Sequence, residues 1–287
     1  MSSNNVNNID LEKELTKLKI NQKILEQQVT TLKEDKLKLQ GELAKIQKEQ
    51  IEYLQNVSHQ LVAPLNAMKW HIENLTEGRY RDIDRINKVL RSVYSQATIL
   101  VHLSKNFALM SNLSADHTLS TMTEPTEPIH LCRLLVNLAD DFQPLGWDKD
   151  IHISVIDDPL DKAPDVIVIK NLVSQVFSNI IENGVKYSSP NSEIRISGKY
   201  DAPSKCVVVE ISNTGIPLPD SDFDRIFERG YRTQKAKDAY PAGTGFGLFI
   251  AKKIIDIHNG TIKAFTDKSG KTVFSVALKT NPVANVK

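Results

Sequence analysis

The stretch 53-YLQNVSHQLVAPLNAM-68 has the apolar spacing of a helix, yet it carries a histidine and, five residues later, a proline. Taken alone, it does not decide whether His59 is a reactive group or an ordinary polar side chain, because a lone helical histidine is more often structural. The sequence on either side of this stretch decides the fold of the first half of the chain, and with it the interpretation of His59.

A seven-residue repeat leads into this stretch from the N-terminal side. Its two series are Leu11, Leu18, Leu25, Leu32, Leu39, Ile46 and Tyr53, and Leu15, Gln22, Val29, Lys36, Leu43, Gln50 and Val57. Leucine in the first series, with polar residues at some positions of the second, favours a parallel dimeric coiled coil. A single amphipathic helix lying on a core is the alternative. We predict a disordered N-terminus over residues 1–8 and a coiled coil over residues 9–50.

The same heptad frame places His59 away from the seam between the helices, because Val57 takes position a and His59 then takes position c. Pro64 removes a backbone donor and is expected to bend the helix one turn beyond the histidine. After 74-NLTEGRY-80 a second helix is predicted, since apolar residues recur at helical spacing as far as Met110. Two such hairpins, each within residues 51–118, would form an all-α dimeric four-helix bundle.

The composition of the chain limits the classes of protein to which it can belong. The chain of 287 residues has room for about two domains, and its net charge of +1 gives no sign of a nucleic-acid-binding surface. No apolar run has transmembrane length, and the N-terminal segment lacks the apolar core of a signal peptide. Cys132 and Cys206 lack the spacing of metal ligands. We therefore expect a cytoplasmic protein with reduced thiols.

The second half of the chain mixes helix and strand patterns after a linker over residues 119–128, which is rich in Thr and Pro. Helices are predicted at 131–142, 168–187 and 248–258. Strands are predicted at 151–156, 193–200, 206–212 and 272–278, where β-branched residues alternate with others. These patterns predict an α/β sandwich over residues 129–282, with helices on one face of a mixed sheet.

Three short segments of this half carry candidate ligand-binding residues. In 179-NIIENGVKYS-188, Asn179, Asn183 and Lys186 share one helix face, which suits a metal and a polyphosphate but is also compatible with ordinary exposed polar residues. In 213-NTGIPLP-219, a strand ends in Asn-x-Gly, which lets the backbone approach a ligand but is also a simple turn.

The third segment, 242-AGTGFGLFIAKKIIDIHNG-260, places three glycines before a helix, whose free N–H groups and dipole favour phosphate. Its spacing is not the dinucleotide fingerprint. A basic loop over residues 220–241 precedes it and is a candidate lid.

Together, and in this order, these features resemble the dimeric sensor histidine kinases of two-component systems. The resemblance covers roughly residues 50–280 and implies a Bergerat-type ATP-binding domain of the GHKL fold behind the helical bundle. It implies that His59, in 57-VSHQLVAPL-65, is the phosphoacceptor for ATP. The stretch 226-IFERGYR-232 matches the Phe-containing box of the family.

The resemblance also assigns roles to single residues. Asn183 would ligate Mg²⁺, and Asn213 would accept a hydrogen bond from adenine. The remaining nucleotide-binding residues would be Asn179, Lys186, Tyr187, Gly215, Arg232, Gly243, Thr244, Gly245, Gly247 and Leu248. The implied partners are a second copy of the chain, the receiver domain of a response regulator, and an upstream sensory protein acting through the coiled coil.

Three positions depart from the family pattern. Gln60 stands where the family usually has an acidic residue that assists proton removal, and glutamine is no general base at neutral pH. Ala63 replaces the Thr or Asn of members that dephosphorylate their partner. Asn213 replaces an aspartate, with Pro217 at the second glycine of that motif, so weaker adenine binding is expected.

Three functions therefore compete. The first is a kinase that phosphorylates His59, with Gln60 beside the reaction. The second, kept because of the three departures, is a degenerate kinase that binds ATP as a signalling scaffold. The third is an ATP-driven clamp of the wider fold family, which the coiled coil beside a histidine disfavours.

Overall fold

The computed structural model describes the backbone of residues 3–114, 124–241 and 243–280. It divides into two compact units, Met1–Gln55 and Asn56–Lys287. The predicted linker over residues 119–128 lies partly outside the described residues, and the predicted domain boundaries stay predictions. Within the described residues, no helix combines the length and the apolar character needed to span a membrane.

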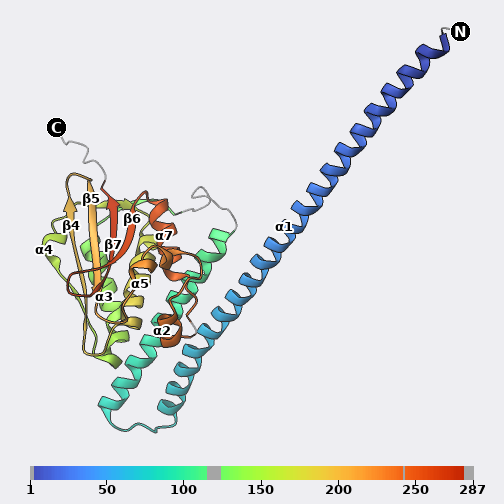
Figure 1. Cartoon of the computed structure of the whole chain (residues 1–287). Coiled ribbons are helices and arrows are strands. Elements are labelled where there is room, and N and C mark those ends of the chain that lie inside the picture. The colour runs from blue at the N-terminus through green and yellow to red at the C-terminus, as the bar shows by residue number, and fades with distance from the viewer. Residues whose placement is uncertain (1–2, 115–123, 242, 281–287) are drawn as a thin grey trace. The chain divides into compact units, whose positions relative to one another are not determined.

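The helix α1 runs from Ser3 to Thr76 (Figure 1). It begins before residue 9, at which we expected the coiled coil to start, and the predicted disorder of residues 1–8 stays a prediction. Leucines of the heptad seam are exposed along the first unit, for example Leu25 at 62% and Leu32 at 67%. Such a row of exposed leucines on one helix is typical of a coiled-coil strand without its partner.

The helix α1 continues through Pro64, and the bend predicted at this residue stays a prediction. Proline removes a single intrahelical hydrogen bond. In this helix the turns on both sides persist, and Pro64 itself is buried. As the heptad frame predicts, His59 is exposed while Val57 is buried.

The helix α2, Ile83–Ser114, follows a short turn and forms a hairpin with the last turns of α1 (Figure 1). A hydrogen bond of 3.0 Å between Ser92 Oγ and His71 Nε2 joins the two helices. Many large apolar side chains of the hairpin stay exposed, namely Val62, Leu65, Trp70, Ile72, Ile83, Leu90, Tyr94 and Val101. A second hairpin would cover such side chains in the four-helix bundle that we predicted.

The second half is an α/β sandwich, as predicted. Its main sheet has the order β2-β4-β5-β7-β6, formed by β2 (His152–Val155), β4 (Glu193–Asp201), β5 (Cys206–Asn213), β7 (Thr272–Lys279) and β6 (Thr261–Thr266). The pair β2 and β4 is parallel and the other pairs are antiparallel. A two-stranded sheet pairs β1 (Glu127–Ile129) with β3 (Val166–Val168).

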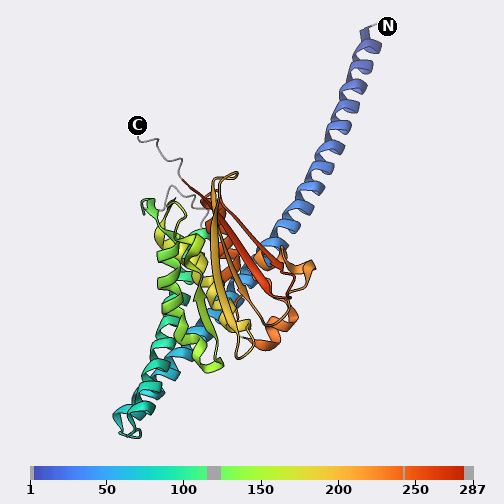
Figure 2. The ribbon, with the colours of Figure 1, turned by 90° about the vertical axis from the view of Figure 1, so that its left-hand side faces the viewer.

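The helices α3 (Leu131–Gly146), α5 (Lys170–Tyr187) and α7 (Gly247–Ile257) cover one face of the main sheet (Figure 2). Their apolar sides and the inward side chains of β4 and β5 form the core, in which Phe177, Ile194 and Ile250 are fully buried. The short helix α4 is Asp157–Leu160, and the turns η2 and η3 are Trp147–Lys149 and Asp220–Asp222. The segment predicted as a lid contains η4 (Arg225–Phe227) and α6 (Gln234–Ala239).

Candidate nucleotide-binding site

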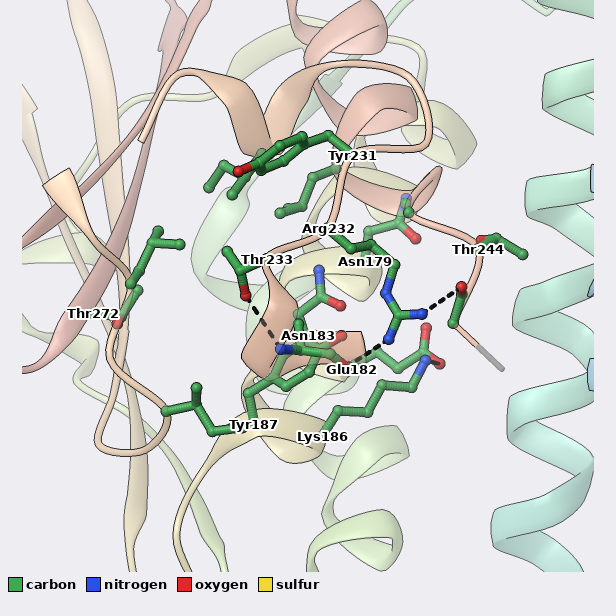
Figure 3. Close-up of a pocket in the computed structure, with 18 of the residues that line it drawn as sticks. Asn179, Glu182, Asn183, Lys186, Tyr187, Tyr231, Arg232, Thr233, Thr244 and Thr272 are labelled. Carbon is green, nitrogen blue, oxygen red and sulfur yellow. Dashed lines mark hydrogen bonds and ion pairs between the residues drawn. The ribbon is translucent and has the colours of Figure 1, made fainter. Parts of the chain in front are cut away.

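A pocket lies where α5, the end of β5, the lid segment and the glycine-rich turn meet (Figure 3). All of its lining residues belong to the unit Asn56–Lys287. The lining residues predicted from sequence are Gln60, Asn179, Asn183, Lys186, Tyr187, Asn213, Arg232, Gly243, Thr244, Gly245, Gly247 and Leu248. The structure therefore brings together segments that are far apart in the chain.

Two predicted site residues do not line the pocket. His59 is exposed on α1, directly before Gln60, which does line it. Gly215 lies behind the pocket wall and bridges to Ser188. A Cβ atom at Gly215 would stand 1.9 Å from the carbonyl oxygen of Tyr187, so only glycine lets the end of β5 approach the end of α5 this closely.

Beside the pocket lies a cluster of ionisable side chains on α5 and α2, with the carboxylate of Glu182 at its centre. Glu182 is 6% exposed. Its Oε1 lies 2.6 Å from Lys186 Nζ, and its Oε2 lies 2.5 Å from His102 Nδ1. Burial by itself raises the pKa of Glu182, but the charge of Lys186 and the contact with His102 outweigh it. They hold the pKa of Glu182 far below its ordinary value, so the carboxylate stays ionised.

A second polar contact joins α2 to the pocket. Asn106 Nδ2 donates a hydrogen bond of 2.8 Å to Asn179 Oδ1. Gln175 Nε2 donates one of 3.0 Å to Asn106 Oδ1. Because Asn179 and Gln175 both lie on α5, these two hydrogen bonds hold the side chain of Asn179 against α2.

The guanidinium of Arg232 holds the lid segment. Its nitrogens donate to the carbonyl oxygens of Ala236 at 2.6 Å, Gly243 at 2.7 Å and Pro241 at 3.2 Å, and also to that of Tyr240. We predicted that Arg232 contacts the nucleotide. In the structure its hydrogen bonds also hold together the end of the lid segment and the glycine-rich turn, above Lys186 in the view of Figure 3.

Another lysine fixes the lid at its far side. Lys149 Nζ donates to Tyr240 Oη at 2.7 Å and to the carbonyl oxygens of Val185 and Lys186 at the end of α5. The Tyr187 and Tyr240 rings also meet edge to face. The lid is thus bound to the last turn of α5, beside the pocket.

The glycine-rich turn leads into α7, whose N-cap residue Phe246 offers no side-chain cap. Gly245 has a positive φ of 73° and packs against the backbone of Gly230, which explains the glycine at this position. The first N–H groups of α7 have no acceptor within the helix, so they are available to an anion.

The pocket is also lined by apolar side chains, namely Ile216, Pro217, Leu218, Ile226 and Phe274. Asn213, 6% exposed, lines it next to its strand partner Thr272, and its Nδ2 donates to Ser188 Oγ at 3.1 Å. Thr272 lies across the pocket from Lys186 and Thr244 (Figure 3). We call the side of Asn213 and Thr272 the apolar end and the side of Lys186 and Thr244 the polar end. Apolar lining with a buried amide, together with a lysine and a helix N-terminus, suits a purine nucleotide.

Sequence reasoning missed several residues of the pocket, among them Glu182, Asn106, Tyr231 and Thr233. Glu182 lies between the two candidate asparagines of α5. A glutamate four positions before Lys186 on the same helix is a sequence pattern that could have indicated a contact between the two side chains. Asn106 gave no local signal, because its partner Asn179 is far away in the chain.

The oxygen donors at the polar end suit Mg²⁺. No cluster of three His, Cys, Asp or Glu side chains that could hold a metal occurs among the described residues. Magnesium instead commonly takes one or two protein oxygens and completes its shell with substrate phosphates and water. The half-buried Asn183 lines the pocket one turn from Asn179, so its amide oxygen can serve as such a ligand.

Comparison with known proteins agrees with this geometry. The family of histidine kinase-, DNA gyrase B-, and HSP90-like ATPases matches residues 169–282. Sensor histidine kinase WalK of Bacillus subtilis (strain 168) is 26% identical over 280 residues, which cover 94% of this chain and 43% of the relative. Sensor protein kinase WalK of Staphylococcus haemolyticus (strain JCSC1435) is 27% identical over 234 residues, which cover 81% and 37%.

Among solved structures, full-length ShkA in complex with AMPPNP is 19% identical, with a TM-score of 0.51 over 79% of this chain and 45% of that chain. This likeness supports the fold. Residues 169–282 thus match the model of histidine kinase-, DNA gyrase B-, and HSP90-like ATPases, and the chain is similar to sensor histidine kinases along most of its length. It spans less than half the length of the two WalK relatives.

Proposed function

We propose that this chain is an ATP-dependent protein-histidine kinase that phosphorylates its own His59 and passes the phosphoryl group to an aspartate of a response-regulator receiver domain. The observation that carries the proposal is the position of Gln60. This residue lines the same pocket as Asn183, Lys186 and the glycine-rich turn, and it directly follows the exposed His59 on α1.

In this proposal the purine lies at the apolar end, near Asn213 and Phe274. The phosphates lie at the polar end, where Lys186 and the first N–H groups of α7 offer positive charge and donors. Asn183 holds Mg²⁺, with Asn179 as its companion. Bound Mg²⁺ would neutralise phosphate charge and orient the γ-phosphate for displacement.

The reaction follows from the chemistry of the imidazole. The unprotonated ring nitrogen of His59 attacks the γ-phosphorus, the nitrogen–phosphorus bond forms, and the bond to the β,γ-bridging oxygen breaks. ADP leaves, and the ring loses the proton of its other nitrogen to solvent. Gln60 can donate or accept a hydrogen bond in this process but cannot take that proton. The carboxylate of an aspartate in the receiver domain then attacks the phosphorus, an acyl phosphate forms as the nitrogen–phosphorus bond breaks, and the ring takes up a proton from solvent to give neutral His59.

The proposed assembly is a homodimer in the cytoplasm. The exposed heptad leucines of α1 and the exposed apolar face of the α1–α2 hairpin supply two consecutive dimer contacts. The coiled coil also offers a connection through which an upstream sensory protein could act on His59.

The degenerate scaffold is the second candidate, because Gln60 stands at the reaction site and Ala63, which lacks a polar group, lies one helical turn beyond His59. In that case the pocket would bind nucleotide and no phosphohistidine would form.

Incubation of the purified chain with γ-³²P-ATP and Mg²⁺ distinguishes the two candidates. The kinase predicts acid-labile label on the wild type and none on His59→Ala, followed by transfer of the label to a receiver domain. Nucleotide binding without label on the wild type would instead support the scaffold.

A further inference from the structure

The apolar end of the pocket contains a buried amide. Asn213 ends β5, opposite Thr272 of β7, and is nearly closed off from solvent. Phe274 and Ile216 line the same end, while Lys186 and Thr244 lie across the pocket from Thr272 (Figure 3). If phosphates occupy the polar end, the edge of the base faces Asn213. This inference therefore rests on the proposed nucleotide-binding function.

The hydrogen bond between Asn213 Nδ2 and Ser188 Oγ leaves the amide oxygen of Asn213 for a ligand. Ser188 is itself 6% exposed, so this pairing is shielded from water. A serine hydroxyl can donate as well as accept. Ser188 can therefore also satisfy Asn213 after a half-turn of the amide, in which Ser188 donates to Oδ1 and the NH₂ group faces the ligand.

The two orientations of the amide fit two kinds of purine. With Oδ1 toward the base, Asn213 accepts a hydrogen bond from the 6-amino group of adenine. With Nδ2 toward the base, it donates to the 6-oxo group of hypoxanthine or guanine. An ionised carboxylate at this position could only accept, and it would leave a 6-oxo group facing a negative acceptor.

We propose that Asn213, backed by Ser188, lets this pocket bind 6-oxopurine nucleotides as well as adenine nucleotides. The nucleotide class of the site is then purine in general, and base selection at the 6-position is weak.

The test compares ADP with inosine diphosphate, because neither can donate a γ-phosphate and hypoxanthine lacks the 2-amino group of guanine. Binding to the full chain is measured by isothermal titration for the wild type and for Asn213→Asp. For the wild type we expect dissociation constants within about tenfold of each other, since each base finds a matching hydrogen-bond partner. Asn213→Asp should retain ADP and weaken inosine diphosphate by about tenfold or more relative to ADP.

Wild-type binding of inosine diphosphate that is more than about tenfold weaker than that of ADP would overturn the inference, whatever the variant does. An unchanged ratio in Asn213→Asp would overturn it too, because another group would then select the base. In both cases ADP binding would leave the proposed function standing. Absence of binding by either nucleotide would overturn the proposed function together with this inference.

Discussion

At the scale of single residues, Glu182 makes two contacts that join the pocket to the helical bundle. Its carboxylate contacts Lys186, a predicted phosphate ligand on α5, and His102, a buried side chain of the bundle helix α2. The carboxylate thus joins a residue of the pocket to the helical hairpin. Removing one partner from such a buried cluster leaves the others uncompensated, which typically costs about 3–5 kcal/mol.

The first prediction concerns the pH dependence of stability in Glu182→Gln. The pKa of Glu182 is lowered in the folded chain from an ordinary value of 4.5, so its stabilising contribution is present above that value and is lost as pH falls below it. The difference in unfolding free energy between wild type and variant should shrink as pH falls below about 4.5. Urea unfolding at a series of pH values measures it.

The matched control is Glu210→Gln, which removes an exposed carboxylate from β5. Its effect should be small at every pH, because an exposed charge interacts weakly. If the difference in unfolding free energy between wild type and Glu182→Gln stayed constant down to pH 3, Glu182 would not have the lowered pKa that we assign to it.

The second prediction concerns Gln60. The change Gln60→Glu supplies a carboxylate beside His59 that can take the imidazole proton, so autophosphorylation should become faster by about tenfold or more. Initial rates of acid-labile labelling measure this, with Gln55→Glu as a control on the exposed surface of the same helix. Equal rates for wild type and Gln60→Glu would mean that proton removal does not limit the reaction.

At this scale the sequence predicted half of the residues that line the pocket, because their types and spacing on α5 and at the glycine-rich turn carry chemistry. It did not predict the contacts of Asn106 and His102 with α5, which depend on how two distant helices pack. It also assigned Arg232 only to the nucleotide, whereas its hydrogen bonds to lid carbonyls depend on the path of the lid.

At the scale of elements, the junction between β5 and α5 shapes the pocket. The N–H of Ile216 donates to the carbonyl oxygen of Tyr187 at 3.0 Å, and Gly215 bridges to Ser188. This junction also positions Ser188 beside Asn213. Any group that separates the two elements should therefore disturb the end of the pocket that receives the base.

The third prediction follows from this close approach. Gly215→Ala should destabilise the chain by about 1–3 kcal/mol, because the new Cβ overlaps backbone atoms of Tyr187 and Ser188. ADP affinity should fall as well. Thermal unfolding and titration calorimetry measure the two effects.

Gly41→Ala is the control, because nothing lies within 4 Å of its new Cβ in α1. Alanine in a helix interior should there be neutral or stabilising by about 0.5–1 kcal/mol. If Gly215→Ala were as stable as the wild type and bound ADP with the same affinity, the close approach of β5 to α5 would not be needed for the pocket.

Long elements with strong periodicity were predictable, including α1, α5 and the strands β4, β5 and β7. The strands β1 and β3 have three residues each, which gives too little pattern to detect. Pro64 did not mark a helix end, because the neighbouring turns of α1 persist across one missing hydrogen bond.

At the scale of the whole molecule, the exposed leucines of α1 argue for a second copy of the chain. The fourth prediction is that Leu32→Asp, at a seam position with 67% exposure, shifts the chain from dimer to monomer, because a charge in the seam is not compensated. Size-exclusion chromatography with light scattering measures the mass at micromolar concentration.

Lys38→Asp introduces the same side chain at heptad position c, away from the seam, and should leave the dimer intact. A Leu32→Asp variant with unchanged mass would exclude this part of α1 from the dimer contact. A lower labelling rate in the monomer would further indicate that the bundle needs both chains to present His59.

We propose that one chain contains both the nucleotide pocket and His59, the histidine that accepts the phosphoryl group. The most direct measurement is mass spectrometry at neutral pH of the tryptic peptide spanning residues 49–69, whose only histidine is His59, after incubation with Mg²⁺ and ATP. The account predicts one added phosphoryl group on His59 in the wild type and none in Asn183→Ala. An unmodified peptide from a chain that binds ATP, or a phosphoryl group on another histidine, would contradict it.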